Sequence, residues 1–184
     1  MSFSNSCVQL ADKVDKLIQK ITLTIAWVYV FLVVIIIAQV FMRYVLGTGH
    51  PMVEELQWHF YAIGIMFGLS YSQTLDSHIR VDVVAGLLKK RTRLMWEVFG
   101  ILVLALPFVF VVFYNSLDFV YESWRVNESS DAPIGLPWRW LIKGVIPVSF
   151  FFLGVTLITR LIRVLVDLFN PTMNVINEES NHGA

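Results

Sequence analysis

Four long apolar runs limit what this chain can fold into. They cover residues 21–42, 56–75, 94–121 and 138–166. A helix needs roughly 20 residues to cross the hydrocarbon core of a bilayer, where its backbone must satisfy its own hydrogen bonds. Each run has this length, so the sequence predicts an all-α membrane protein with four transmembrane helices. We expect a single four-helix domain over residues 1–184, with a polar C-terminal tail at 170–184.

The composition indicates that lipid is the solvent for much of this chain. Its 184 residues are 57% hydrophobic and 15% charged, whereas a soluble domain carries about 45–50% apolar and about 25% charged residues. The formal net charge is zero, which argues against a nucleic-acid partner because such a partner needs a basic field. The single cysteine, Cys7, excludes an internal disulfide.

The lysines and arginines orient the expected helices. Most of the 14 lie near the N-terminus, in residues 80–93 and near the C-terminus, which four crossings would place on one side of the bilayer. The positive-inside rule puts this side in the cytoplasm, so both termini are expected there. Tryptophan prefers the interface, and four tryptophans fall at the expected outer ends of the helices: Trp58, Trp124, Trp138 and Trp140.

The stretch "TLDSHIRVDVVAGLLKKRTR", residues 74–93, separates the second and third runs. An apolar stripe at helical spacing, Val81, Val84, Ala85 and Leu88, predicts a short amphipathic helix lying along the inner membrane surface. Polar residues alternate just before it: Asp76, His78, Arg80 and Asp82. Two interpretations remain open, a topology anchor and a contact site for a partner. Catalysis is less favoured because this side offers no nucleophile or set of metal ligands.

Several ionisable residues lie near the expected outer membrane surface. Glu54 and Glu55 open the second run, close to Arg43 at the end of the first. They are either helix-start carboxylates favoured by the helix macrodipole or specific partners of Arg43. His59 lies one turn deeper, where a packed polar residue is favoured over a proton relay.

Two further features concern contacts between helices. Asp118 and Lys143 lie at comparable depth on the third and fourth runs, which favours a structural ion pair over a transport site. Gly64, Gly68 and Ser72 form a ridge of small residues on the second run, and such a ridge permits close helix approach.

The inventory of reactive residues argues against an enzyme. A haem held by two histidines needs a facing pair within the membrane, and only His59 of the four histidines lies within an expected span. The chain lacks the cysteines of a membrane disulfide-exchange enzyme, a phosphate loop, and a Ser–His arrangement typical of a membrane protease. We therefore expect no catalytic residues, no cofactor and no metal.

The motifs along the chain resemble one transporter family. "FMRYVLG" ends the first run, "EEL" opens the second, "HIRVDV" follows it, and "ESSDAPIGLPWRWLIKGVIP" covers residues 128–147. Together they are similar to the small membrane subunit, the Q or DctQ-like subunit, of tripartite ATP-independent periplasmic (TRAP) transporters. The last segment is most similar to the branch annotated for mannitol or chloroaromatic compounds.

The resemblance implies an accessory subunit in a bacterial inner membrane. Its partners would be a large membrane subunit, which carries the substrate and sodium sites and moves like an elevator, and a periplasmic substrate-binding protein. The small subunit would brace the static scaffold during sodium-coupled uptake of organic acids. Two alternatives remain open: an autonomous small transporter or channel using His59, Asp118 and Lys143, and a membrane anchor of a redox complex.

Overall fold

The computed structural model describes residues 2–75, 89–132 and 135–169, and the structural statements below concern these residues. The described chain is helical throughout, apart from short connections, which confirms the all-α prediction. The helices in chain order are α1 (Ser2–Ala26), α2 (Val28–Val45), α3 (Pro51–Thr74), α5 (Lys90–Phe99), the π-helical segment η1 (Gly100–Ala105), α6 (Leu106–Arg125) and α7 (Trp140–Phe169).

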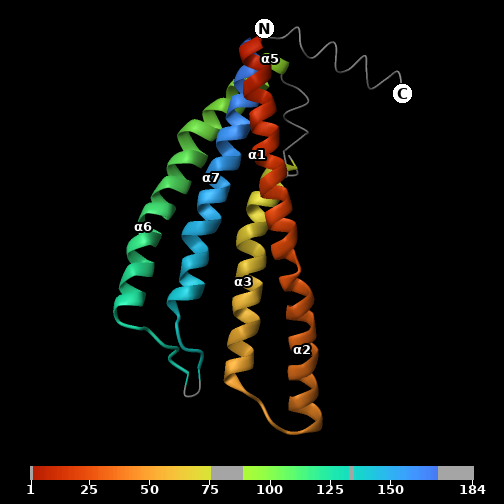
Figure 1. Cartoon of the computed structure of the whole chain (residues 1–184), viewed down its shortest axis with the longest axis vertical. Helices are drawn as coiled ribbons and strands as arrows, with labels where there is room; N and C mark the ends of the chain where they lie inside the picture. Colours follow the sequence, from red (N-terminus) through yellow and green to blue (C-terminus); the bar gives the residue numbers. More distant parts are fainter. Residues whose placement is uncertain (1, 76–88, 133–134, 170–184) are drawn as a thin grey trace, which may run out of the picture.

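These helices form four antiparallel rods (Figure 1). α1 and α2 are joined at Trp27 into one rod, and α5, η1 and α6 make another. α7 packs against α6, α3 and α1, while α2 packs against α3. The start of α1 and the end of α7 lie at the same end of the bundle, here called the terminal end (Figure 1). The connection 46–50 and the described residues of the connection 126–139 lie at the opposite end, here called the loop end.

Three helical stretches are long and apolar enough to cross a bilayer: Ser6–Val45, Lys90–Arg125 and Trp140–Phe169. They contain the expected first and third spans and all but the first two residues of the expected fourth span. The expected second span, 56–75, falls on α3, which has 24 residues but is not apolar enough to join that set. Its polar residues include Gln57, His59 and Gln73. Length and apolarity therefore support three crossings, and the crossing expected at 56–75 stays a prediction.

The first helix begins well before the apolar run that predicted it. α1 starts at Ser2 rather than near Ile21. It buries Ala11, Asp15, Ile18 and Thr22, a spacing that places all four on one helical face. This face packs on α3 and α7, so the polar N-terminal segment is the amphipathic first half of a longer rod.

Pro107 alters the third rod just before its own position. Proline has no N–H to donate and crowds the preceding turn. The structure accommodates it with the wider turn of η1, in which the Leu106 N–H bonds to the Ile101 carbonyl five residues earlier. Pro147 lies inside α7, and this helix continues through it.

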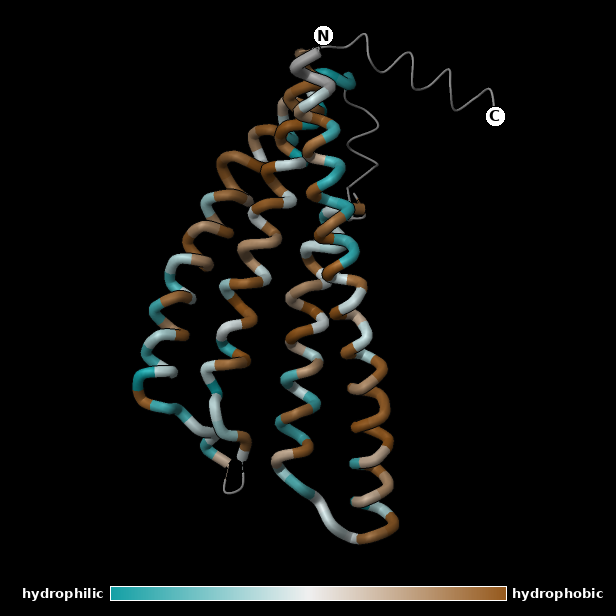
Figure 2. Tube along the Cα trace, viewed as in Figure 1, coloured by the Kyte–Doolittle hydropathy of each residue, from teal (hydrophilic) through white to brown (hydrophobic). Residues whose placement is uncertain are grey.

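A small apolar core holds the middle of the bundle together. Ile101, Val109, Phe150 and Leu157 form a buried cluster between the third rod and α7. Most of the apolar surface of α2 is exposed instead, and Figure 2 shows this helix as almost uniformly hydrophobic. An exposed apolar face of this extent suits contact with lipid.

The two glycines in the small-residue ridge of α3 lie in different surroundings. A Cβ atom at Gly64 would overlap the ring of Tyr29, so this glycine lets the first rod approach α3 closely. A Cβ atom at Gly68 would meet nothing within 4 Å, and Gly68 is exposed. The ridge therefore serves packing within the chain at Gly64 and leaves Gly68 open.

This division predicts unequal effects of the same substitution. Gly64→Leu should lower the free energy of unfolding in detergent by about 1–3 kcal/mol, since the new side chain must displace Tyr29. Gly68→Leu is the matched control and should leave the isolated chain nearly unchanged. Adding Tyr29→Ala should recover much of the Gly64→Leu loss. Equal destabilisation by the two leucines would contradict this account of the ridge.

Candidate functional site: polar contacts at the two ends of the bundle

Glu55 connects the start of α3 to the connection 126–139. Its carboxylate accepts a hydrogen bond from the Ser130 hydroxyl and one of 2.7 Å from the Leu136 backbone N–H. A Cβ atom at Gly135 would overlap the Ser130 side chain, so glycine allows this close approach. Glu55 therefore holds the loop between α6 and α7 against α3.

A second set of charges joins this loop to α7. Glu128 pairs with Lys143, and its other carboxylate oxygen lies 3.6 Å from Arg139 Nη1. Arg139 also pairs with Asp131 at 3.1 Å. These contacts fix the loop at its α7 end, as Glu55 does at α3.

Hydrogen bonds lower the pKa of both loop-end carboxyls. The bond from Lys143 holds the pKa of Glu128 below its ordinary value. The Leu136 N–H, followed by the Ser130 hydroxyl, lowers the pKa of Glu55, which precedes the expected span at 56–75. Both contacts favour the ionised carboxylate, so both are complete at neutral pH.

The expected pair of Asp118 with Lys143 is wrong. Lys143 Nζ bonds to Glu128 and lies 4.0 Å from the centre of the Phe119 ring. Asp118 is exposed on α6 and has no ion-pair partner within the described part of the chain. Adjacent residues on a helix point about 100° apart, at about 3.6 residues per turn. Because Phe119 faces Lys143, Asp118 points elsewhere despite its matching depth.

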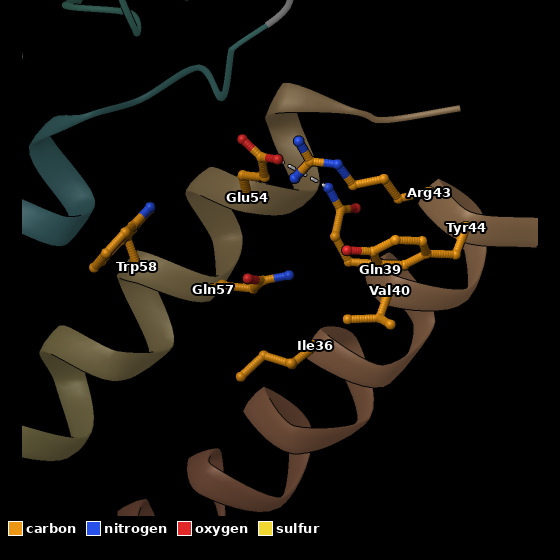
Figure 3. A pocket seen from close by; sticks show the side chains of 8 residues that line it. All are labelled: Ile36, Gln39, Val40, Arg43, Tyr44, Glu54, Gln57 and Trp58. Carbon is orange, nitrogen blue, oxygen red and sulfur yellow. Dashed lines mark hydrogen bonds between the residues drawn. The ribbon is translucent and has the colours of Figure 1, made fainter. Parts of the chain in front are cut away.

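Arg43 lies across a cavity from Glu54 and pairs with neither Glu54 nor Glu55. Gln39 Nε2 donates to Glu54 Oε1 at 3.2 Å, and Glu55 is engaged with the loop. Among residues 2–75, 89–132 and 135–169, Arg43 has no carboxylate within ion-pair distance. Figure 3 shows Arg43 and Gln39 on α2 facing Glu54 and Gln57 on α3. Together they line a cavity of about 340 Å³.

His59 is tied to its own helix. Its Nδ1 lies 2.5 Å from the Glu55 carbonyl oxygen, one turn earlier. A carbonyl oxygen only accepts hydrogen bonds, so Nδ1 carries the proton and donates. The contact accounts for a half-buried polar side chain at this position without a proton relay.

A polar cluster at the terminal end was not predicted from the sequence. Arg163 on α7 lies 2.5 Å from Asp15 and 3.0 Å from Asp12 on α1. The Thr159 hydroxyl donates to Asp15 at 2.7 Å. The signal for this cluster was a pair of acidic residues at i, i+3 on α1, facing hydroxyl and guanidinium groups one turn apart on α7.

A further ion pair at the terminal end joins α5 to α7. Arg160 Nη2 lies 2.6 Å from Glu97 Oε1, and both side chains are less than one-fifth exposed. α7 is therefore bonded to α1 and α5 at one end of the bundle and to the connection 126–139 at the other.

The alternating residues of the inner loop lie outside the described residues. This applies to Asp76, His78, Arg80 and Asp82 and to the amphipathic helix expected after them. Their roles as an anchor or a contact site stay predictions. Of the basic cluster that follows, Lys89 immediately precedes α5, and Lys90 is the first residue of that helix.

A protein-family model covers the whole loop end of this bundle. The model for the DctQ component of tripartite ATP-independent periplasmic transporters matches residues 32–167, from within α2 to near the end of α7. The chain belongs to the DctQ family. A search of curated proteins gave no match.

Membership of the DctQ family confirms the resemblance read from the motifs. The family is a component of a membrane transporter. The matched range includes Arg43, Glu54, Glu55, Glu128 and Lys143. It omits residues 2–31, so the α1 carboxylates of the terminal cluster lie outside the matched range.

The observed pairing predicts coupling between Glu128 and Lys143. Lys143→Met and Glu128→Gln should each lower the free energy of unfolding in detergent, because each removes the contact between these two charges. The double variant should lose less than the sum of the two. Lys143→Met combined with Asp118→Asn is the matched control and should be additive. Strong coupling in the control and none in the first pair would contradict the observed geometry.

The lowered pKa of Glu55 predicts an acid-sensitive loop. A depressed carboxyl pKa stabilises the fold fully above the ordinary glutamate value of 4.5, and this contribution is lost as pH falls through the lower folded value. Hydrogen exchange of the Leu136 amide, corrected for its intrinsic rate, should therefore accelerate in acid.

Glu55→Ala should accelerate Leu136 exchange at neutral pH and remove its acid dependence. Glu122→Gln is the control, because Glu122 pairs with its near neighbour Arg125 on the exposed end of α6. If Leu136 is equally protected with and without the Glu55 carboxylate, that bond does not hold the loop.

Proposed function

We propose that this chain is the accessory small permease subunit of a sodium-coupled TRAP transporter that imports organic acids. The DctQ match over residues 32–167 is the observation that carries this proposal. In this arrangement the large membrane subunit moves the substrate, and the present chain braces its static scaffold. The third component is a periplasmic substrate-binding protein.

The internal contacts support a bracing role. Polar bonds join α7 to α1 and α5 at the terminal end, and the loop to α3 and α7 at the loop end. A rod fixed at both ends resists the shear that a moving neighbour would apply. Cavities of about 340 Å³ and 230 Å³ lie between α2 and α3, and one of about 200 Å³ lies between α6 and α7.

The arrangement also supports a specific membrane placement. α3 lies between α2 and α7 (Figure 1) and packs against α1, α2 and α7, so we propose that it also crosses the bacterial inner membrane, as the second of four spans in chain order. Its polar residues would then be sheltered by neighbouring helices. The terminal end would face the cytoplasm, following the distribution of lysine and arginine.

The open part of α3 is our proposed contact with the large subunit. Helices in lipid associate through close packing and polar contacts, because lipid supplies little hydrophobic drive between them. Gly68 is exposed with free space above it, which allows another backbone to approach. The inner-loop residues Asp76, His78, Arg80 and Asp82 are further candidates for this interface.

Reconstitution tests the accessory role directly. Vesicles with the large subunit, the binding protein and this chain should show sodium-driven uptake of the organic acid, and omission of this chain should abolish it. Gly68→Leu should lower uptake and copurification while the chain still inserts, and the exposed Arg125→Gln is the matched control.

Three outcomes would overturn the proposal. Full uptake without this chain would remove the need for an accessory subunit. Uptake by this chain alone would favour the autonomous transporter, and a haem absorption band would favour the redox anchor.

A further inference from the structure

A groove runs along the exposed side of the contact between α2 and α3. The part nearest the loop end, here called the upper part, is the cavity of about 340 Å³. The part nearer the middle of the bundle, here called the lower part, is a cavity of about 230 Å³. The two share Ile36, Gln57 and Trp58, so they form one continuous groove. From Arg43 down to Leu32 the groove follows α2 for about 16 Å, at about 1.5 Å per residue.

The two parts of the groove differ in chemistry. Arg43, Gln39, Glu54 and Gln57 gather in the upper part (Figure 3). The lower part is lined mainly by apolar and aromatic side chains, including Leu32 and Tyr61. A polar head above an apolar channel matches the shape of a phospholipid rather than that of a soluble metabolite.

The upper part offers polar atoms that nothing in the described chain uses. Gln39 is only 6% exposed, and its Oε1 is buried without a hydrogen-bond partner. Gln57 Nε2 is likewise a buried donor without a partner. Such groups cost free energy unless they are satisfied. The site therefore calls for a ligand that both donates and accepts hydrogen bonds.

The charges of the upper part specify the headgroup further. The Arg43 guanidinium, without a carboxylate partner in the described residues, is a bidentate donor suited to phosphate. Glu54 supplies a negative charge on the opposite wall. A purely anionic headgroup would place its negative charge close to the Glu54 carboxylate. A headgroup that carries both charges can pair its phosphate with Arg43 and its ammonium with Glu54.

The residues around the groove fit the headgroup level of a bilayer. Tyr44 is 83% exposed and Trp58 is 70% exposed, and both line the upper part. Tyrosine and tryptophan favour the membrane–water interface. Phe41 and Ile37, on the neighbouring surface of α2, are exposed apolar residues suited to acyl chains.

We propose that this groove binds one phospholipid whose headgroup carries a phosphate and a primary ammonium, as in a phosphatidylethanolamine. Arg43 and Gln57 donate to the phosphate oxygens. Glu54 and Gln39 Oε1 accept from the ammonium. One acyl chain follows Leu32, Ile36 and Tyr61. This inference needs a chain embedded in a bilayer but does not depend on the transport role.

Lipid retention by the full-length chain tests the assignment. The purified chain in mild detergent is mixed with phosphatidylethanolamine, phosphatidylglycerol or phosphatidylcholine of identical acyl chains, and bound lipid is counted by native mass spectrometry. Phosphatidylethanolamine should be retained most strongly. Phosphatidylcholine should bind less because its ammonium has no N–H to donate to Glu54 and Gln39.

Variants assign each half of the headgroup. Arg43→Gln should weaken phosphatidylethanolamine binding about tenfold, the loss expected for one charge-assisted contact. Glu54→Gln should remove the preference for ethanolamine over glycerol while retaining phosphate binding. Arg125→Gln is the matched control: it removes an exposed loop-end arginine that pairs with Glu122, away from the groove.

A variant that fills the groove separates loss of lipid binding from loss of the fold. Ile36 is 41% exposed and lines both parts of the groove, so Ile36→Trp should fill it without disturbing the core. This variant should unfold at the wild-type temperature and retain little phosphatidylethanolamine. Unchanged retention by a folded Ile36→Trp chain would overturn the location.

The wild-type chain alone also decides the headgroup. Equal retention of the three lipids, or a preference for phosphatidylglycerol, would overturn the assignment. A second result would reject a lipid altogether. The chain would retain no lipid, and Arg43 would be protected from a guanidinium-modifying reagent only when the large subunit is present. The groove would then bind a protein side chain.

Discussion

Helices within a bilayer gain little by hiding apolar surface from one another, so their association depends on close packing and on polar contacts. In this chain the polar contacts are concentrated on α7. Arg163 and Thr159 bind α1, Arg160 binds Glu97 on α5, and Lys143 binds the loop that leads into α7. The apolar cluster around Phe150 and Leu157 fills the space between these two polar ends.

The sequence predicted the helical class and the approximate position of each rod, because length and apolarity are direct requirements of a lipid environment. It did not predict that the first helix begins at Ser2. That extension depends on an amphipathic face with Asp15 at its centre, and a buried aspartate becomes acceptable only when Arg163 and Thr159 satisfy it. Apolarity alone cannot reveal such a face.

The sequence identified the residues of the candidate site more accurately than it identified their bonding partners. Glu54, Glu55, Arg43 and Lys143 were all recognised as notable, yet the bonds they form involve Gln39, Ser130, Leu136 and Glu128. Depth along a helix can be counted from sequence, but rotation about its axis decides which residues face each other. Asp118 illustrates this, since one step along α6 separates it from the residue that contacts Lys143.

The bond between Glu55 and Leu136 has a consequence for how this loop can vary. The donor is the backbone N–H of Leu136, and every residue type except proline provides this group. Substitutions at position 136 are therefore compatible with the bond, whereas an insertion or deletion between Ser130 and Leu136 would carry the amide away from the carboxylate. Relatives that keep this hydrogen bond should therefore conserve the length of the segment between Ser130 and Leu136 more strictly than the identity of its residues.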